Sequence, residues 1–316
     1  MRVLITGGNG YLGGRLAQFL ASQEGCEILL GSRQQAGSSS WLPRAMVAQT
    51  QWDSLPSLEQ TCMGVDAIVH LAGMNAQDSL ADPVAALEVG VVATARLLQA
   101  AVRQEVKRFI YISTAHIYGS PLTGCIDEET LPRPRHPYAI SHLAAEDVVL
   151  AAHDEGQLTG VVLRLSNGFG VPAHPGVNCW TLLVNDLCRQ AVTDHCLVLR
   201  STGSQRRDFV TMHNVVRAVA HMIDLPRWQV GNGIFNVGGR WAPQVFDFAR
   251  IIQARCSTVL GVTPKIVCPE AGSSEVVLDL EYRINKLSAT GFVLMGDPVT
   301  EIDATLRLCR AARSNA

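Results

Sequence analysis

Three glycines near the N-terminus are spaced in a way that could bind a pyrophosphate. Gly7, Gly10 and Gly13 follow a short apolar run and precede an apolar helical pattern. In a strand–turn–helix unit, the first glycine permits the tight turn, the second lets the backbone approach the phosphates, and the third packs the helix closely on the strand. The helix N-terminus adds free N–H groups and a partial positive charge. The alternative is an ordinary glycine-rich turn. The predicted dinucleotide contacts are Gly7, Asn9, Gly10, Tyr11, Leu12 and Gly13.

The end of the second apolar run indicates which dinucleotide binds. Cys26–Leu30 is followed by Gly31-Ser32-Arg33, where an NAD-specific unit usually places an Asp or Glu that hydrogen-bonds the adenosine ribose. The Arg33 guanidinium could instead bind a 2′-phosphate, and no carboxylate stands there to repel it. Ser32 and Arg33 therefore favour NADP(H) over NAD(H), although a solvated loop cation is the alternative for Arg33.

Two further strand ends carry residues suited to the same ligand. Asp53 follows a weak apolar run, and its carboxylate could accept a hydrogen bond from the adenine amino group; alternatively, Asp53 caps a helix. Leu71, Ala72 and Gly73 follow another predicted strand, and the small side chains there allow the backbone to approach a cofactor closely. Ligands of open parallel sheets bind at the carboxyl ends of the strands, so these residues join the predicted cofactor site.

The elements that must hold these residues alternate between strands and helices. Pro83 is expected to open a helix to about Arg103, and Pro137 another to about His153. The order of elements predicts an α/β fold with a parallel sheet and helices on both faces. The runs expected to be strands are Met1–Thr6, Cys26–Leu30, Ala45–Ala48, Asp66–Leu71, Arg108–Ser113 and Gly160–Leu165.

The composition limits the class of protein. The 316 residues carry 26 Lys and Arg against 28 Asp and Glu, a net charge of −2, so no basic field points to nucleic acid or an anionic membrane. No apolar run approaches the ~20 residues of a membrane span, and the N-terminus enters a strand directly, without a signal peptide. The nine cysteines are scattered without metal-ligand spacing, which is typical of thiols in a reducing compartment. We therefore expect a cytoplasmic protein without a metal site that binds small molecules.

Later motifs complete a pattern that covers about residues 1–225. They are Thr6–Gly13, His70–Gly73, Ser113–Gly119, Pro137–His142, Arg164–Gly170 and Arg207–Val210. In this order they resemble the extended short-chain dehydrogenase/reductase family of nucleotide-sugar epimerases, dehydratases and reductases. The resemblance implies a Rossmann doubly wound parallel sheet with a smaller C-terminal α/β substrate-binding domain. Residues 1–165 would form the dinucleotide-binding domain and 166–316 mainly the substrate-binding domain, with some segments returning to the Rossmann sheet. It also implies a homodimer formed through the two long helices.

The resemblance assigns the catalytic groups. In the family, a Tyr phenol exchanges a proton with a sugar hydroxyl while nicotinamide exchanges a hydride at the same carbon, and Tyr138 matches that Tyr. The hydroxyl that holds the substrate oxygen maps to Thr114, with Ser113 as second choice. The family tunes the phenol, whose usual pKa is near 10, with a Lys one helical turn later. This chain has His142 there, on the same helix face, where imidazole supplies little fixed positive charge. It also has Gly90 where the family often has Asn.

The substrate side of the resemblance implies a nucleotide sugar. Asn167 and Arg207 match family residues that lie near or contact the diphosphate, and an Arg suits phosphate through its fork of donors. The alternative for Arg207 is an ion pair with Asp208 or another carboxylate. Glu270 and Glu275 lie where family members often carry a second Arg. Because these carboxylates would repel a diphosphate, an unusual nucleotide or another substrate class stays open.

The reaction type is less determined. Ala115 and His116 follow Thr114, where family dehydratases carry acidic residues, so dehydration is not expected. The remaining activities are those of an NAD(P)-dependent oxidoreductase or epimerase acting on a nucleotide sugar. A different class stays open because Gly90 and His142 depart from the family: a catalytically weak or inactive NADP(H)-binding regulatory protein.

Overall fold

The computed structural model describes residues 1–33, 37–39, 41–270 and 277–314. At its centre lies one eight-stranded sheet. Its strands are β1 (Arg2–Thr6), β2 (Glu27–Ser32), β3 (Gly37–Ser38), β4 (Met46–Gln49), β5 (Ala67–His70), β6 (Arg108–Thr114), β8 (Thr159–Leu165) and β12 (Ile234–Val237). Their order is β12-β8-β6-β5-β1-β2-β4-β3. Every neighbouring pair is parallel except β3 and β4, which are antiparallel.

The direction in which strands are added reverses between β1 and β5. From β1 the chain moves outward through β2 and β4, and it then adds β5, β6, β8 and β12 on the other side. Thr6, at the end of β1, pairs with Gly31 of β2 and His70 of β5. The segments that follow these three strands therefore converge at the point where a doubly wound sheet binds its ligand.

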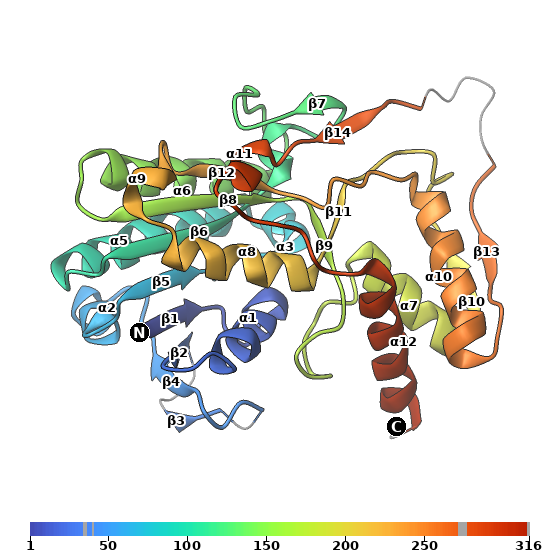
Figure 1. Ribbon diagram of the computed structural model, residues 1–316, viewed down its shortest axis with the longest axis horizontal. Coiled ribbons are helices and arrows are strands. Elements are labelled where there is room, and N and C mark those ends of the chain that lie inside the picture. The colour runs from blue at the N-terminus through green and yellow to red at the C-terminus, as the bar shows by residue number, and fades with distance from the viewer. Residues whose placement is uncertain (34–36, 40, 271–276, 315–316) are drawn as a thin grey trace.

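Side-chain alternation along the strands builds a core on each face of the sheet. Val3 and Ile5 of β1 lie in one core, and Leu4 between them lies in the other, as a period of two requires. Helices α1 (Tyr11–Ala21) and α8 (Met212–Asp224) cover the first face. The other face is covered by α2 (Leu55–Cys62), α5 (Ala93–Arg103) and α6 (Pro137–Asp154). The layered α/β arrangement in Figure 1 confirms the predicted fold class.

The helix expected from Pro83 to Arg103 contains one π turn. It runs through α4 (Pro83–Leu87), η1 (Glu88–Val92) and α5, after the short α3 (Ala76–Ala81). A Cβ on Gly90 would lie 3.1 Å from Cβ of Ser141, so the glycine lets η1 approach α6 closely. Contrary to the sequence expectation, this run is long and apolar enough to cross a membrane by length and composition alone. Its contacts with α2 and α6 place it instead in the helix layer of the sheet.

The C-terminal part of the chain forms a second core beside the sheet. It contains α7 (Leu183–Thr193), α10 (Val245–Leu260), α12 (Pro298–Ser314), β10 (Cys196–Val198) and β13 (Lys265–Val267). Figure 1 shows these helices to the right of the sheet, packed around Phe169, Phe209 and Phe248. The smaller elements are η2 (Ala115–Tyr118), β7 (Gly124–Ile126), β9 (Asn167–Phe169), β11 (Phe209–Thr211), α9 (Arg227–Val230), β14 (Leu280–Tyr282) and α11 (Asn285–Ala289). Strand β12 returns to the main sheet beside β8, while a domain boundary at 165/166 stays a prediction.

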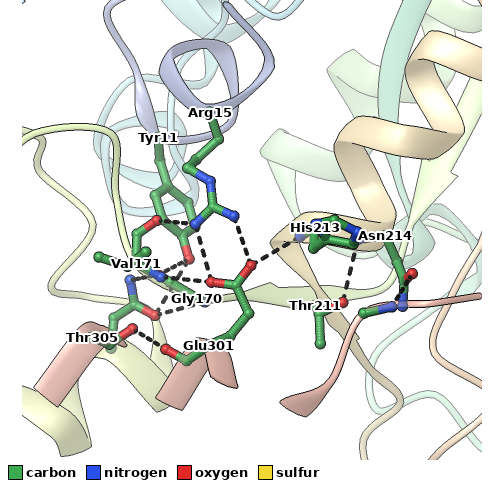
Figure 2. A network of polar contacts seen from close by, with 11 residues as sticks. Tyr11, Arg15, Gly170, Val171, Thr211, His213, Asn214, Glu301 and Thr305 are labelled. Carbon is green, nitrogen blue, oxygen red and sulfur yellow. Dashed lines mark hydrogen bonds and ion pairs between the residues drawn. The ribbon is translucent and has the colours of Figure 1, made fainter. Parts of the chain in front are cut away.

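One carboxylate joins the two parts of the molecule. Glu301 of α12 accepts hydrogen bonds from the Arg15 guanidinium of α1 at 2.7 and 3.0 Å. It also accepts from the backbone N–H groups of Val171 at 3.1 Å and His213 at 3.0 Å (Figure 2). At Gly170, where φ is +143°, a Cβ would lie 2.3 Å from Oε2 of Glu301. We call these contacts the Glu301 clasp; they hold α1, the helix of the glycine turn, against the C-terminal part.

Candidate active site

The glycine turn has the geometry of a phosphate cradle. Gly7 lies at φ +70°, where a Cβ would lie 3.0 Å from the backbone nitrogen of Ala72, and a Cβ on Gly13 would lie 2.3 Å from the carbonyl oxygen of Gly7. Gly10 is the N-cap of α1 and provides no side-chain cap. The N–H groups of the first helical turn are thus left to an anion, and the turn fits the pyrophosphate of a dinucleotide.

The side chains of the predicted phosphate contacts point to other partners. The Tyr11 hydroxyl donates to the carbonyl of Gly170 at 2.6 Å, and Leu12 packs against the core under the sheet. Asn9 accepts a hydrogen bond from the Trp41 indole N–H at 3.3 Å. Tyr11 and Leu12 can therefore contact a phosphate only through their backbone N–H groups.

The residues predicted to bind the adenosine half are accessible. Ser32 ends β2, and Arg33 follows it with an exposed side chain. Asp53 is also exposed, and the N-cap of α2 is Ser54, whose hydroxyl accepts from the N–H of Ser57 at 3.4 Å. The alternative that Asp53 caps this helix is therefore wrong, and its carboxylate stays available to a ligand.

A buried histidine ties the end of β5 to the glycine turn. Nδ1 of His70 lies 2.6 Å from the Thr6 hydroxyl, and Nε2 lies 2.9 Å from the Thr94 hydroxyl. Burial lowers the pKa of His70 to about 3, so the ring is neutral. The Thr6 hydroxyl also accepts from the first two N–H groups of the segment 71–73. A Cβ on Gly73 would meet no atom within 4 Å, which leaves this backbone open to a ligand.

The N-terminus of α6 positions the predicted acid/base. His136 caps the helix through Nδ1, which accepts from the N–H of Tyr138 at 3.2 Å, and Pro137 occupies the first turn. The Thr114 hydroxyl, at the end of β6, accepts from the N–H of His116 at 3.2 Å and lies near the Tyr138 phenol. Burial raises the pKa of Tyr138 above its usual value, and the nearby Thr114 hydroxyl only partly opposes this effect. The phenol is therefore protonated at neutral pH.

Only one of the two candidate hydroxyls is beside Tyr138. The Ser113 hydroxyl donates to Glu146, whose carboxylate pairs with the Arg164 guanidinium at 2.7 Å in a fully buried ion pair. Ser113 is thus committed to this pair, and the structure favours Thr114. The sequence analysis missed Glu146 and Arg164, although Glu146 follows Tyr138 at a spacing of two helical turns.

His142 lies beside Tyr138 but carries no charge. Its ring meets the Tyr138 ring edge-on, with the centroids 4.4 Å apart. Its Nδ1 lies 2.8 Å from the hydroxyl of Tyr111, a residue that the sequence analysis did not single out. Burial lowers the pKa of His142 to about 4, and the nearby His116 adds to the effect. At neutral pH the position that matches the family Lys therefore offers a neutral imidazole.

Asn167 and Arg207, the predicted substrate ligands, differ in whether other residues of the chain already occupy their side chains. The Asn167 amide donates to the carbonyl of Asp208 at 2.9 Å. The Asp208 carboxylate is buried and accepts from the Ser166 hydroxyl and from the N–H groups of Gly239 and Trp241. Asp208 is therefore not an ion-pair partner of its neighbour Arg207. Asn167 holds the backbone beside β11 through one N–H, which leaves its carbonyl oxygen and its second N–H for a ligand.

Arg207 makes no ion pair within the described residues and is exposed. Its positive charge lowers the pKa of His116, after the larger effect of burial, and His136 contributes as well. Arg207, His116 and His136 thus gather near the Tyr138 site at the carboxyl edge of the sheet. Glu270 is exposed, and Glu275 lies outside the described residues.

A phosphate cradle at the switch point and a tyrosine–threonine pair beside it define a dinucleotide-dependent enzyme of the Rossmann type. The sequence matches the NAD dependent epimerase/dehydratase family over residues 3–238. It is 30% identical over 270 residues to dTDP-glucose 4,6-dehydratase of Streptomyces niveus, covering 81% of this chain and 78% of that protein. The chain therefore belongs to the NAD dependent epimerase/dehydratase family and is an enzyme of that type.

Solved structures show the same fold. UDP-glucuronic acid 4-epimerase from Bacillus cereus, in complex with UDP-glucuronic acid and NAD, superposes with a TM-score of 0.79 at 20% identity, over 99% of this chain and 100% of that chain. RMD from Pseudomonas aeruginosa, complexed with NADPH, gives a TM-score of 0.77 at 21% identity, over 98% and 99% of the two chains. Structural neighbours of this chain thus bind either NAD or NADPH.

Proposed function

We propose that this enzyme acts on a nucleotide sugar by hydride transfer, with Tyr138 as acid/base and NADP(H) as cofactor. The observation that carries the proposal is the Tyr138 phenol, which lies near the Thr114 hydroxyl at the carboxyl ends of the strands, where the glycine turn also lies. A bound dinucleotide would supply or accept the hydride. Thr114 would hold the sugar oxygen, and Tyr138 would exchange a proton with that oxygen.

The protonation state of the site favours reduction of a keto sugar. Burial raises the pKa of Tyr138, and His142, with its pKa lowered to about 4, adds no positive charge that would stabilise a phenolate. Tyr138 is thus ready to donate a proton to a carbonyl oxygen, the role that a keto-reductase needs. An epimerase, which must also remove a proton from a hydroxyl, is the second candidate. The NADPH complex of RMD is consistent with a reductive cofactor.

Arg33→Ala should remove a preference for NADPH over NADH. The exposed guanidinium after β2 would bind the 2′-phosphate through charge-assisted hydrogen bonds, which typically contribute ~1.5–3 kcal/mol. Calorimetric titration of both dinucleotides checks the expected loss of about tenfold or more for NADPH alone. Lys107→Ala is the control. This exposed cation directly precedes β6 and therefore lies at the amino ends of the parallel strands, away from the predicted dinucleotide site. Equal affinities in the wild type would contradict the reading and favour NAD and an epimerase.

Arg207→Ala should weaken nucleotide-sugar binding far more than dinucleotide binding. Arg207 makes no ion pair within the described residues and lies near enough to His116 for its charge to lower the pKa of that ring. A diphosphate that it binds would lose about tenfold or more in affinity. Arg206→Ala is the matched control, since that side chain is held by the carbonyl of Ala242 and by Asp279. Titrations with UDP-glucose, dTDP-glucose and GDP-mannose measure the effect. If none of these affinities changes, Arg207 is not a diphosphate ligand.

We also propose a cytoplasmic homodimer. The nine cysteines are free thiols, which suits a reducing compartment. Helices α4, η1 and α6 expose Val84, Leu87, Val89, Val92 and Ile140, an apolar surface that a second copy would cover. Sedimentation equilibrium distinguishes the dimer from the monomer.

A regulatory NADP(H)-binding protein is the second class of function. Two departures from the family favour a regulatory protein. His142 places a neutral imidazole where the family has Lys, and Gly90 stands where the family often has Asn. Mass spectrometry of ligands that copurify with the protein, followed by turnover assays on a panel of nucleotide keto-sugars with NADPH, separates the two classes. Turnover supports the enzyme, whereas bound dinucleotide without turnover on the panel supports the regulatory protein.

A further inference from the structure

The Tyr111 hydroxyl has a single hydrogen-bond partner among the described residues. Tyr111 lies on β6 and is 3% exposed. Its oxygen lies 2.8 Å from Nδ1 of His142, and the two ring centroids are 5.6 Å apart. Burial raises the pKa of Tyr111 well above its usual value. The phenol therefore keeps its proton and must place it on an acceptor.

This pairing selects one tautomer of His142. If Nδ1 carried the imidazole proton, it would donate to Tyr111, and the buried phenol proton would face no acceptor in the described part of the chain. A buried unsatisfied donor costs about 1–3 kcal/mol. The arrangement that satisfies both groups has the Tyr111 O–H donating to Nδ1, which leaves the imidazole proton on Nε2.

No group around His142 favours a charged ring. The side chains that face it are Tyr111 from β6, Tyr138 from α6, His116 from η2 and His70 from β5. The carboxylate one turn further along α6, Glu146, is paired with Arg164. An imidazolium at 142 would thus be buried without a counter-ion, which is costly.

The other nitrogen of His142 is left for a ligand. Nε2 makes no hydrogen bond within the described residues, and it is not among the fully buried polar atoms that lack a partner. Since Nδ1 is occupied by Tyr111, Nε2 is the ring nitrogen that can bond a ligand. A ligand hydroxyl at this position would accept a hydrogen bond from Nε2–H.

We propose that Tyr111 is a positioning residue that holds His142 as a neutral imidazole protonated on Nε2, so that position 142 offers a hydrogen-bond donor to the bound dinucleotide without adding positive charge. The dinucleotide part of this inference rests on the proposed function, whereas the tautomer belongs to the ligand-free protein. The consequence is a site that keeps a hydrogen-bond donor beside Tyr138 while its phenol stays protonated.

Nitrogen-15 NMR of the ligand-free protein, labelled at histidine, tests the tautomer without any turnover. His142→Gln identifies the His142 signals by their loss. At pH 7 we expect Nε2 in the protonated range and Nδ1 in the unprotonated range, with neither moving down to about pH 6 because the pKa is about 4. A protonated Nδ1, or an imidazolium at pH 7, would overturn the proposal.

Three variants test the positioning role by dinucleotide titration. Tyr111→Phe should shift the Nδ1 signal and lower NADPH affinity about tenfold, the effect of one misplaced hydrogen bond. Tyr118→Phe, which removes a buried hydroxyl that bonds Asn236 and Arg164, should leave both readouts unchanged. His142→Gln, with an uncharged N–H donor, should retain more affinity than His142→Leu. Equal losses in Gln and Leu would overturn the donor role, and wild-type affinity in Tyr111→Phe would overturn the positioning role.

The outcomes separate this inference from the proposed function. If the Nε2–H tautomer is found and no nucleotide sugar is turned over, the positioning of His142 stands and the enzymatic proposal falls. If turnover is found and His142 is charged or protonated on Nδ1, the enzymatic proposal stands and this inference falls.

Discussion

Tyr138→Phe should lower turnover of a nucleotide keto-sugar by about 10²–10⁴-fold, the usual effect of removing a general acid. The phenyl ring can keep its edge-on contact with His142, whose centroid lies 4.4 Å away, but it has no proton to give. The cradle formed by the glycine turn is untouched, so NADPH affinity should stay within about twofold of the wild type. The loss of NADPH absorbance in a stopped-flow assay measures the rate.

A graded series makes this result interpretable. Thr114→Val removes the hydroxyl that lies near Tyr138 and should cause a smaller loss of turnover, because the proton donor remains. Circular dichroism and NADPH titration establish that each variant is folded. If Tyr138→Phe retains most of the activity, the proton comes from another group, and His116, which lies close to His142, becomes the first candidate.

Glu301→Ala should lower the free energy of unfolding by about 3–5 kcal/mol, the effect of removing one partner of a buried ion pair. The Glu301 side chain is 6% exposed and that of Arg15 is 16% exposed, so little water can replace the lost carboxylate. The backbone N–H groups of Val171 and His213 lose their acceptor at the same time. The shift of the urea midpoint, read by circular dichroism, measures the change.

Two comparisons separate the stabilisation by the Glu301 clasp from the general effect of removing a negative charge. Glu59→Ala removes a carboxylate paired with Arg103, whose side chain is 53% exposed, and should cost about 0–1 kcal/mol. Glu301→Gln keeps the shape and one acceptor oxygen and should fall between the other two variants. A Glu301→Ala midpoint equal to that of Glu59→Ala would show that the clasp does not stabilise the fold.

Local signals in the sequence were sufficient for most of the sheet and for the beginning of the site, but they did not predict β3 or β12. Strands expected from short apolar runs lie within two residues of their observed bounds, because alternating burial on the two faces of a sheet is imposed residue by residue. Pro137 marks the start of α6 because proline fits the first helical turn. The spacing of Gly7 and Gly13 predicts the tight turn and the close packing of α1, since both follow from the lack of a Cβ.

The tertiary structure decided which candidates are free to act. Ser113 and Thr114 are adjacent in sequence, yet the Ser113 hydroxyl donates to Glu146 whereas the Thr114 hydroxyl lies near Tyr138, because successive side chains of a strand point to opposite faces. Asp53 was expected either to accept from adenine or to cap a helix, and the backbone at the start of α2 made Ser54 the cap. Such choices depend on orientation, which composition and spacing do not encode.

The contacts that the sequence did not predict join residues that are far apart in the chain. Arg15 and Glu301 are separated by 286 positions, and Tyr111 and His142 by 31 positions, so no sequence period relates them. The π turn at Gly90 likewise depends on the approach of Ser141 from another helix. The sequence alone determined where a phosphate could bind and which tyrosine lies at the helix start. The charge of His142, the freedom of Arg207 and the clasp at Glu301 were decided by the fold, because burial and hydrogen-bond partners exist only once distant segments meet.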